Sequence, residues 1–119
     1  MDFPQIVFHV GEPSAGLDEL MDDAGVSRAA FVTPANRHGR RQSAQENAEA
    51  FLRMNTLLAP TRYRRYAAEG RDPKGEWPPE PGMLIAGMPR AEAEALGRAL
   101  EQNAIVFAER GSPPELVVL

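Results

Sequence analysis

A cluster of arginines precedes the clearest helix-start signal in the sequence. Arg37, Arg40 and Arg41 lie shortly before the S-x-x-E capping box at residues 43–46. The N terminus of a helix leaves backbone amides unpaired and attracts anions, and nearby guanidinium groups strengthen the same field. We therefore expect the 33–41 loop and this helix N terminus to bind a phosphate or carboxylate group. Because the capping box competes for the amides, the arginines would hold the anion; the alternative is a solvated basic turn.

A second group of polar and aromatic residues could complete such a site. Its members are Thr33, Asn36, Asn47, Trp77, Glu80 and Gln102. Thr33 and Asn36 follow an expected strand, whose end points side chains into a crevice, and Asn47 lies one turn into the next helix. Trp77 lies in a loop rich in Gly and Pro, where its ring could stack on a ligand or fill the core. Glu80 in that loop is a candidate general base, although its flanking prolines equally make it a rigid spacer.

Several other chemistries lack the residues that they need. The chain has no cysteine, which excludes disulfides, thiolate nucleophiles and cysteine-ligated zinc. Its two histidines, His9 and His38, do not lie beside acidic clusters at ligand spacing, so no metal site is expected. Phosphate-loop, dinucleotide-binding, nucleophile-elbow and H-E-x-x-H motifs are also absent from the sequence. We therefore expect no cofactor, and the sequence leaves open whether the protein is an enzyme.

Positive charge is concentrated in the middle third of an acidic chain. Residues 37–74 hold nine of the 13 Lys and Arg but only four of the 17 Asp and Glu, although the net charge of the chain is −4. The negative total argues against general nucleic-acid binding, and the basic middle favours an anionic small molecule as the partner. The start of the chain does not resemble a signal peptide, and no run approaches the roughly 20 apolar residues of a membrane span. We expect a cytoplasmic protein that does not contact a membrane.

The elements that would position these residues follow from hydrophobic spacing and turn signals. We expect strands at 5–10, 29–33, 61–69, 83–88, 104–109 and 115–119, and an irregular loop at 70–82. The first helix should begin after Ser14 and end at Gly25, and the third should begin at Pro89 and be capped by Asn103. The second should begin after the capping box and end before Pro60. Its expected apolar face consists of Ala44, Ala48, Phe51, Leu52 and Leu58.

The order of these elements is β-α-β-α-β-β-α-β-β, which contains a β-α-β-β-α-β unit from residue 29 onward. This is the split unit of ferredoxin-like folds, and it packs two helices on one face of an antiparallel sheet. A chain of 119 residues, 43% hydrophobic and 25% charged, is sufficient for one hydrophobic core. We therefore expect a single two-layer α/β (α+β) domain over residues 1–119. An extra N-terminal strand and helix and a C-terminal strand would flank the ferredoxin-like core.

Four stretches of the chain together resemble the small bacterial proteins grouped as DUF3293, over about residues 29–110. The stretches are FVTPAN, the EN at 46–47, EGRDPKGEWPPEPGMLIAGM and LEQNAIVFAE. The positions that match the family pattern are Thr33, Asn36, Glu46, Asn47, Gly70, Asp72, Pro73, Trp77, Glu80, Gln102 and Ala104. Pro34 and Arg37 stand where the pattern has Ala and Pro, and Gly82 replaces a Ser, so a site that needed that hydroxyl would be impaired here. The resemblance implies no known activity.

Two alternatives to an anion site remain. An RNA-binding module would use the interleaved basic and aromatic side chains of Arg62, Tyr63, Arg64, Arg65 and Tyr66. Such a sheet face can stack bases and follow phosphates, but the net charge and the lack of an RNP-like signature oppose this alternative. A protein-interaction or homodimerising domain would use the terminal LVVL as an exposed edge strand.

Overall fold

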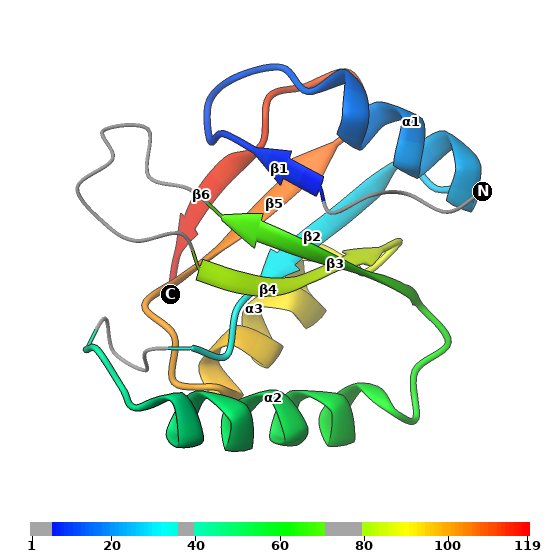
Figure 1. Cartoon of the computed structure of the whole chain (residues 1–119). Helices are drawn as coiled ribbons and strands as arrows, with labels where there is room; N and C mark the ends of the chain where they lie inside the picture. The colour runs from blue at the N-terminus through cyan, green and yellow to red at the C-terminus, as the bar shows by residue number, and fades with distance from the viewer. Residues whose placement is uncertain (1–5, 36–39, 71–79) are drawn as a thin grey trace.

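The computed structural model describes residues 6–35, 40–70 and 80–119 of the chain. Within these ranges the chain forms six strands and three helices (Figure 1). In chain order they are β1 (Ile6–Phe8), α1 (Ala15–Ala24), β2 (Arg28–Val32), α2 (Ala44–Leu58), β3 (Arg64–Gly70), β4 (Glu80–Ala86), α3 (Arg90–Ala99), β5 (Ala104–Glu109) and β6 (Glu115–Val118). The order of helices and strands agrees with the order predicted from the sequence.

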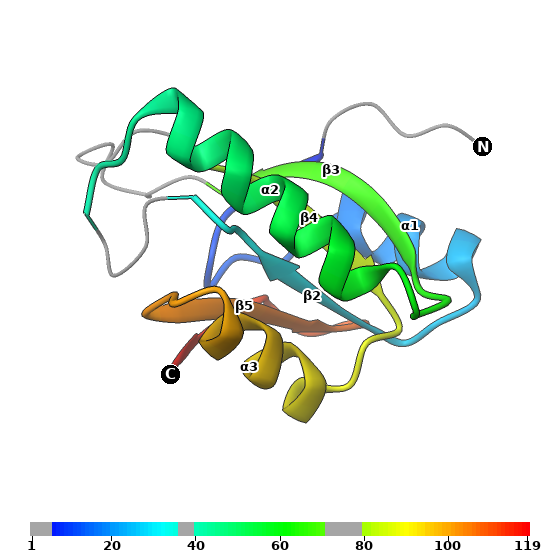
Figure 2. The same ribbon diagram turned by 90° about the horizontal axis from the view of Figure 1, so that it is seen from below.

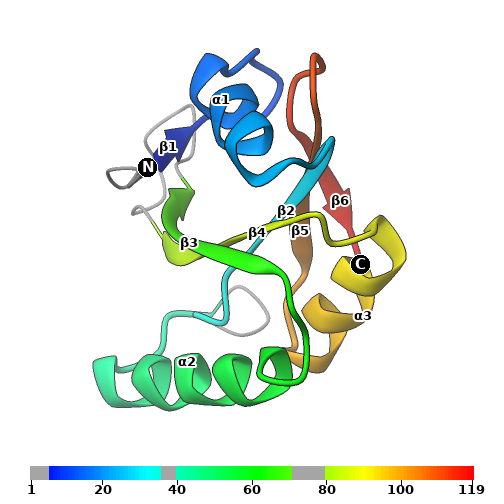
Figure 3. The ribbon, with the colours of Figure 1, turned by 90° about the vertical axis from the view of Figure 1, so that its right-hand side faces the viewer.

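The six strands form one sheet in the order β1-β3-β4-β2-β5-β6. The central strands β3, β4, β2 and β5 are antiparallel neighbours, as the split β-α-β-β-α-β unit requires. β1 extends one edge as a parallel neighbour of β3, and β6 extends the other edge beside β5 (Figure 3). The predicted α+β fold, with its ferredoxin-like core and additional terminal strands, is therefore confirmed.

Helices cover both faces of the sheet. α2 and α3 lie on one face, and α1 lies on the opposite face (Figures 1 and 2). Alternate residues of β2 separate the two cores: Ala30 and Val32 pack in the cluster under α2 and α3, whereas Ala29 and Phe31 pack in the cluster under α1. The sheet with α2 and α3 forms the two predicted layers, and α1 adds a partial third layer.

Side-chain and backbone caps define the boundaries of α1 and the start of α3. The Ser14 hydroxyl accepts a hydrogen bond from the Leu17 amide at 3.2 Å, and Gly25 ends α1 in the left-handed conformation with φ of 70°. Pro89 is the N-cap of α3 and precedes its first helical residue. These boundaries agree with the sequence signals to within one residue, because capping is a local interaction.

The end of α3 differs from the prediction, since Asn103 does not cap it. The helix ends in a Schellman motif, in which the Glu101 amide donates to the Arg98 carbonyl and the Gln102 amide donates to the Gly97 carbonyl, each at 3.0 Å. Glu101 adopts the left-handed φ of 58° that this motif requires. Glycine usually occupies this position, so a glutamate here does not predict the motif.

α2 packs on the sheet with a narrower stripe of side chains than expected. Met54 and Leu58 are buried, and Phe51 is partly buried against the same cluster. Three residues of the predicted apolar face instead remain exposed: Ala44, Ala48 and Leu52. The exposed fraction of Leu52 is 68%. That part of the prediction was wrong because residue 52 lies about 100° around the helix from residue 51, outside the stripe that faces the sheet.

The largest differences in strand boundaries from the prediction are the starts of two strands. β3 begins at Arg64, three residues later than expected, and β4 begins at Glu80, three residues earlier than expected. The pairing of β3 with β4 runs from Arg64 opposite Ala86 to Gly70 opposite Glu80. Residues 80–82 therefore belong to a strand and not to an irregular loop. Long-range pairing with β3 outweighs the local turn preference of Pro81 and its neighbours.

Candidate functional site

Thr33 joins the end of β2 to the start of β4. The β2–β4 ladder ends at Val32 opposite Met83, and beyond it the Thr33 hydroxyl donates to the Pro81 carbonyl at 2.7 Å. The same hydroxyl accepts a hydrogen bond from the Ala35 amide at 3.1 Å. The exit of β2 therefore lies beside the start of β4.

Gln102 holds the same exit of β2 from the other side. Its side-chain amide donates to the Ala35 carbonyl at 3.0 Å, and the Schellman turn at Glu101 places it there directly after α3. Pro34 and Ala35 are buried between these two contacts. The structure thus gives Thr33 and Gln102 a role in fixing residues 33–35, while contact of either side chain with a ligand stays a prediction.

The N terminus of α2 carries the predicted capping box. The Glu46 amide donates to the Ser43 hydroxyl at 3.1 Å, and the Ser43 amide donates to the Glu46 carboxylate at 3.2 Å. Two of the four amides without an intrahelical acceptor are thereby occupied, which leaves those of Ala44 and Gln45. The side chains of the preceding Arg40 and Arg41 are exposed.

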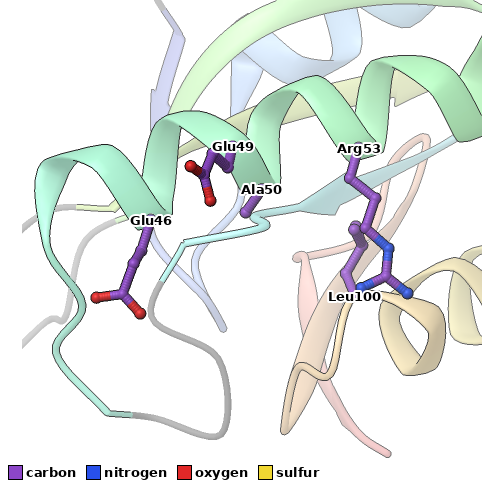
Figure 4. A pocket seen from close by; sticks show the side chains of 5 residues that line it. All are labelled: Glu46, Glu49, Ala50, Arg53 and Leu100. Carbon is purple, nitrogen blue, oxygen red and sulfur yellow. The ribbon is translucent and has the colours of Figure 1, made fainter.

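A groove of about 270 Å³ lies between α2 and the turn after α3 (Figure 4). It is lined by Glu46, Glu49, Ala50, Arg53 and Leu100. Figure 4 shows the Glu46 and Glu49 carboxylates projecting from α2 near its N terminus, with Arg53 further along the helix beside Leu100. Among the described residues, the lining of the groove therefore combines two carboxylates with one guanidinium group.

The sequence prediction missed most of this lining. The sequence identifies Glu46 as a capping residue and as a match to the family pattern, but it does not identify Glu49, Ala50 or Arg53 as site residues. Their spacing of three and four residues places them on one side of an α-helix, so helical periodicity could have grouped them. Leu100 could not have been found in this way, because it reaches the groove only through the packing of α3 on the sheet.

The remaining predicted site residues have different locations. Asn47 is half-buried on α2, and its spacing from the buried Met54 and the partly buried Phe51 places it on the side that faces the sheet. Glu80 is half-buried at the first position of β4, adjacent to the carbonyl that Thr33 contacts. Predictions for Asn36, Arg37, His38 and Trp77 lie outside the described residues.

The two aromatic residues of the RNA alternative lie on opposite faces of the sheet. Tyr63 packs against the cluster under α2 and α3 and donates to the Glu92 carboxylate at 3.1 Å. Tyr66 packs against the cluster under α1, and Arg64 of the same strand lies 3.7 Å from Asp23 of α1. Because helices cover both faces, these side chains do not form one open stacking surface.

Two contacts that shift pKa values join elements of the fold away from the groove lining. Arg110 donates to both oxygens of Asp22, at 2.5 and 2.9 Å, and this hydrogen bond lowers the pKa of Asp22. Desolvation and, to a lesser extent, the hydrogen bond to Glu92 raise the pKa of Tyr63. Asp22 lies on α1 and Glu92 on α3, so both contacts connect a helix to another part of the chain.

The described ranges contain neither a metal-binding cluster nor a membrane-spanning helix. Residues 6–35, 40–70 and 80–119 contain no group of three or more His, Cys, Asp or Glu side chains that could hold a metal ion. Among the helices in these ranges, none combines the length and apolar character needed to cross a membrane.

Comparison with known proteins agrees with the resemblance seen in the sequence. The model of the family DUF3293, described as a protein of unknown function, matches residues 32–105. This match covers more than half of the chain, from β2 to the start of β5, and contains every predicted site residue. No curated protein and no solved structure matches the chain significantly. The chain therefore belongs to the DUF3293 family.

Proposed function

We propose that this protein binds a small molecule through a phosphate or carboxylate group at the 33–41 loop and the N terminus of α2. The observation that carries the proposal is the position of Arg40 and Arg41, two exposed arginines within three residues of the N-cap of a 15-residue helix. Guanidinium groups bind phosphate and carboxylate oxygens in a bidentate manner, and the helix dipole adds to the same field.

The groove beside this helix end indicates where the rest of the ligand would lie. Glu46 and Glu49 repel an anion, so the anionic group would bind at the Arg40 and Arg41 side of the helix terminus. The body of the ligand would extend along the groove toward Arg53, past carboxylates that accept hydrogen bonds from hydroxyl or amino groups. A volume of about 270 Å³ is close to the lower limit for small-molecule sites, which favours a metabolite-sized ligand.

Thr33 and Gln102 support this proposal by fixing one side of the loop. Their hydrogen bonds hold residues 33–35 against β4 and against the turn after α3. A binding segment that is held before the ligand arrives loses less conformational entropy on binding. In this proposal Gln102 and Thr33 position the loop, and the arginines contact the ligand.

Isothermal titration calorimetry at low salt with phosphate, pyrophosphate and citrate tests the proposal. We expect the double variant Arg40→Ala and Arg41→Ala to bind at least tenfold more weakly than the unmodified chain. A matched control removes two exposed arginines elsewhere, Arg62→Ala with Arg98→Ala, and should leave the affinity nearly unchanged. Equal losses in both double variants would mean that only net charge matters, and no heat with any of the three anions would refute the proposal.

A second candidate function is self-association through β6. This strand lies at the edge of the sheet, and two of its four residues expose apolar side chains: Leu116 is 56% exposed and Val118 is 75% exposed. Exposed apolar edge strands pair readily with other strands. Sedimentation velocity over a concentration series should show a dimer that increases with protein concentration, whereas a constant monomer up to millimolar concentration would exclude this function.

A further inference from the structure

The open edge of β6 is bounded by a contact with the turn after β1. β6 pairs with β5 on one side, and within the described ranges no strand pairs with its other side. The carbonyl of Pro114, directly before β6, accepts a hydrogen bond from the Gly11 amide at 2.8 Å. The edge is therefore occupied at Pro114 and open from residue 115 to the end of the strand.

The pairing with β5 determines which backbone groups face the open edge. The Leu119 amide donates to the Asn103 carbonyl at 2.9 Å, so Leu119 directs its backbone groups toward β5. In an antiparallel pair these groups alternate in direction from one residue to the next. The amides and carbonyls of Leu116 and Val118 therefore point to the open edge, with the same alternation as the Pro114 carbonyl that Gly11 contacts.

The same two residues expose their side chains. Leu116 and Val118 lie on one face of β6, and Val117 between them is buried on the other face. No lysine, proline or bulge interrupts residues 115–118, although natural edge strands often carry such features to prevent pairing. The carboxylate of Glu115 forms an ion pair with Arg90 at 2.6 Å, so it would not place an unpaired charge beside an approaching strand.

We propose that the occupant of this edge is a second copy of the chain, paired antiparallel about a two-fold axis at Val117. In that register Leu116 of each copy lies opposite Val118 of the other copy. Both open residues then exchange two backbone hydrogen bonds with their partners, and each exposed apolar side chain contacts another. The inference specifies the register of the self-association proposed above and rests on it.

Other two-fold positions satisfy fewer groups. An axis at Leu116 would place Val118 opposite the partner's Pro114, which has no amide and whose carbonyl is already bonded to Gly11. An axis at Val118 would leave Leu116 beyond the end of the partner's strand. The axis at Val117 therefore fits best, and it joins two six-stranded sheets into one continuous sheet.

The size of this interface predicts a weak dimer. Four residues from each strand bury less than the roughly 1,200 Å² of a standard stable interface. We therefore expect dissociation in the range from micromolar to millimolar concentration. The charge variant Leu116→Lys should weaken the dimer at least tenfold in sedimentation velocity. Leu52→Lys changes a leucine on α2 that is even more exposed, at 68% against 56% for Leu116, and should have no effect.

Disulfide formation can test the register, because the chain contains no cysteine. Opposed residues in a hydrogen-bonded pair have Cα atoms about 5.5 Å apart, which a disulfide can span. Two copies of the same residue at position 116, or at position 118, would be separated by more than the roughly 7 Å that a disulfide allows. We expect a mixture of Leu116→Cys and Val118→Cys chains to form a covalent dimer under mild oxidation, at several times the yield of either variant alone.

The cross-linking and sedimentation results together distinguish the proposed register from self-association in any other register. A Leu52→Cys chain mixed with Val118→Cys gives the background of random collision. Equal or greater yields from either single variant would refute the Val117 axis, while a concentration-dependent dimer of the unmodified chain would preserve self-association. A constant monomer in sedimentation, with cross-linking at the random background, would refute both.

Discussion

Replacing Gly82 with alanine should destabilise the fold, because the added methyl group has no room. A Cβ at this position would lie 2.7 Å from the Val32 carbonyl oxygen and 2.7 and 2.8 Å from two carbons of the Phe31 ring. The carbonyl belongs to the β2 backbone and cannot rotate away. The ring is only 5% exposed and packs edge-on against Phe8, with 5.2 Å between ring centroids.

The expected loss follows from the cost of overpacking. Extra methylene groups in a packed core cost about 1–3 kcal/mol, and the backbone contact places this site toward the upper end of that range. Alanine also restricts the unfolded chain more than glycine does, which offsets roughly 0.4–1 kcal/mol of this destabilisation. A net loss of about 2 kcal/mol in the free energy of unfolding is expected, which with a urea m-value of about 2 kcal/mol/M lowers the midpoint by roughly 1 M.

Urea denaturation of the Gly82→Ala chain, followed by circular dichroism, measures this shift. Gly16→Ala is the matched control, because it makes the same chemical change in α1, where the nearest atom is the Ser14 hydroxyl oxygen at 3.9 Å. This control should raise stability by up to about 1 kcal/mol through helix propensity. An unchanged or higher midpoint for Gly82→Ala would show that the Phe31 ring does not pack over β4 as described.

Three further changes test other contacts. Gln102→Ala should cost about 1 kcal/mol in urea denaturation by removing the hydrogen bond to Ala35, and an unchanged midpoint would contradict the holding role. Glu101→Gly should raise the melting temperature by roughly 4 °C, because glycine adopts the left-handed φ without strain; a lower melting temperature would contradict this reasoning. The pKa of Asp22 lies below its ordinary 3.8, so its contact with Arg110 stabilises the fold above that pH and is lost as pH falls through the lower folded value. Arg110→Ala should raise the pKa of Asp22 in an NMR titration, and an unchanged value would exclude the contact in solution.

The fold could be predicted where its signals are local. Ser14, Gly25 and the capping box of Ser43 with Glu46 each act within four residues, so their types and spacing were sufficient to place the helix ends. The order of strands and helices then limited the topology to a split unit with extra terminal strands. Local sequence signals do not report long-range strand pairing, so they did not predict that β4 begins as early as Glu80.

The face of α2 shows a second limit of sequence reasoning. Apolar residues surround much of this helix, so periodicity alone permitted several orientations. The packing of Met54 and Leu58 against Ile85 and its neighbours selects one orientation and leaves Leu52 in solvent. The choice depends on the shape of the sheet surface, which no local pattern of residues describes.

Only part of the candidate site could be predicted, because the roles of polar residues also depend on the tertiary structure. Polar residues at strand ends can bind a ligand or hold the backbone of the fold, and the sequence does not distinguish these roles. The sequence predicts Thr33 and Gln102 as ligand-binding residues, and the structure shows that both make hydrogen bonds within the chain. The groove lined by Glu49 and Arg53 was missed because one of its walls, at Leu100, depends on how α3 packs.

The extent of the family match separates the two proposed functions. Residues 32–105 include Arg40 and Arg41, the N terminus of α2 and the contacts of residues 33–35, but they include none of β6. If binding of an anion is the property that DUF3293 proteins share, this region should carry it without help from the edge strand. The double variant of Arg40 and Arg41 should then lose affinity for phosphate while its sedimentation stays unchanged, and Leu116→Lys should show the opposite pattern. If either variant altered both properties, the loop and the edge strand would have to be coupled through β5, and the ligand site would have to be sought nearer to β6.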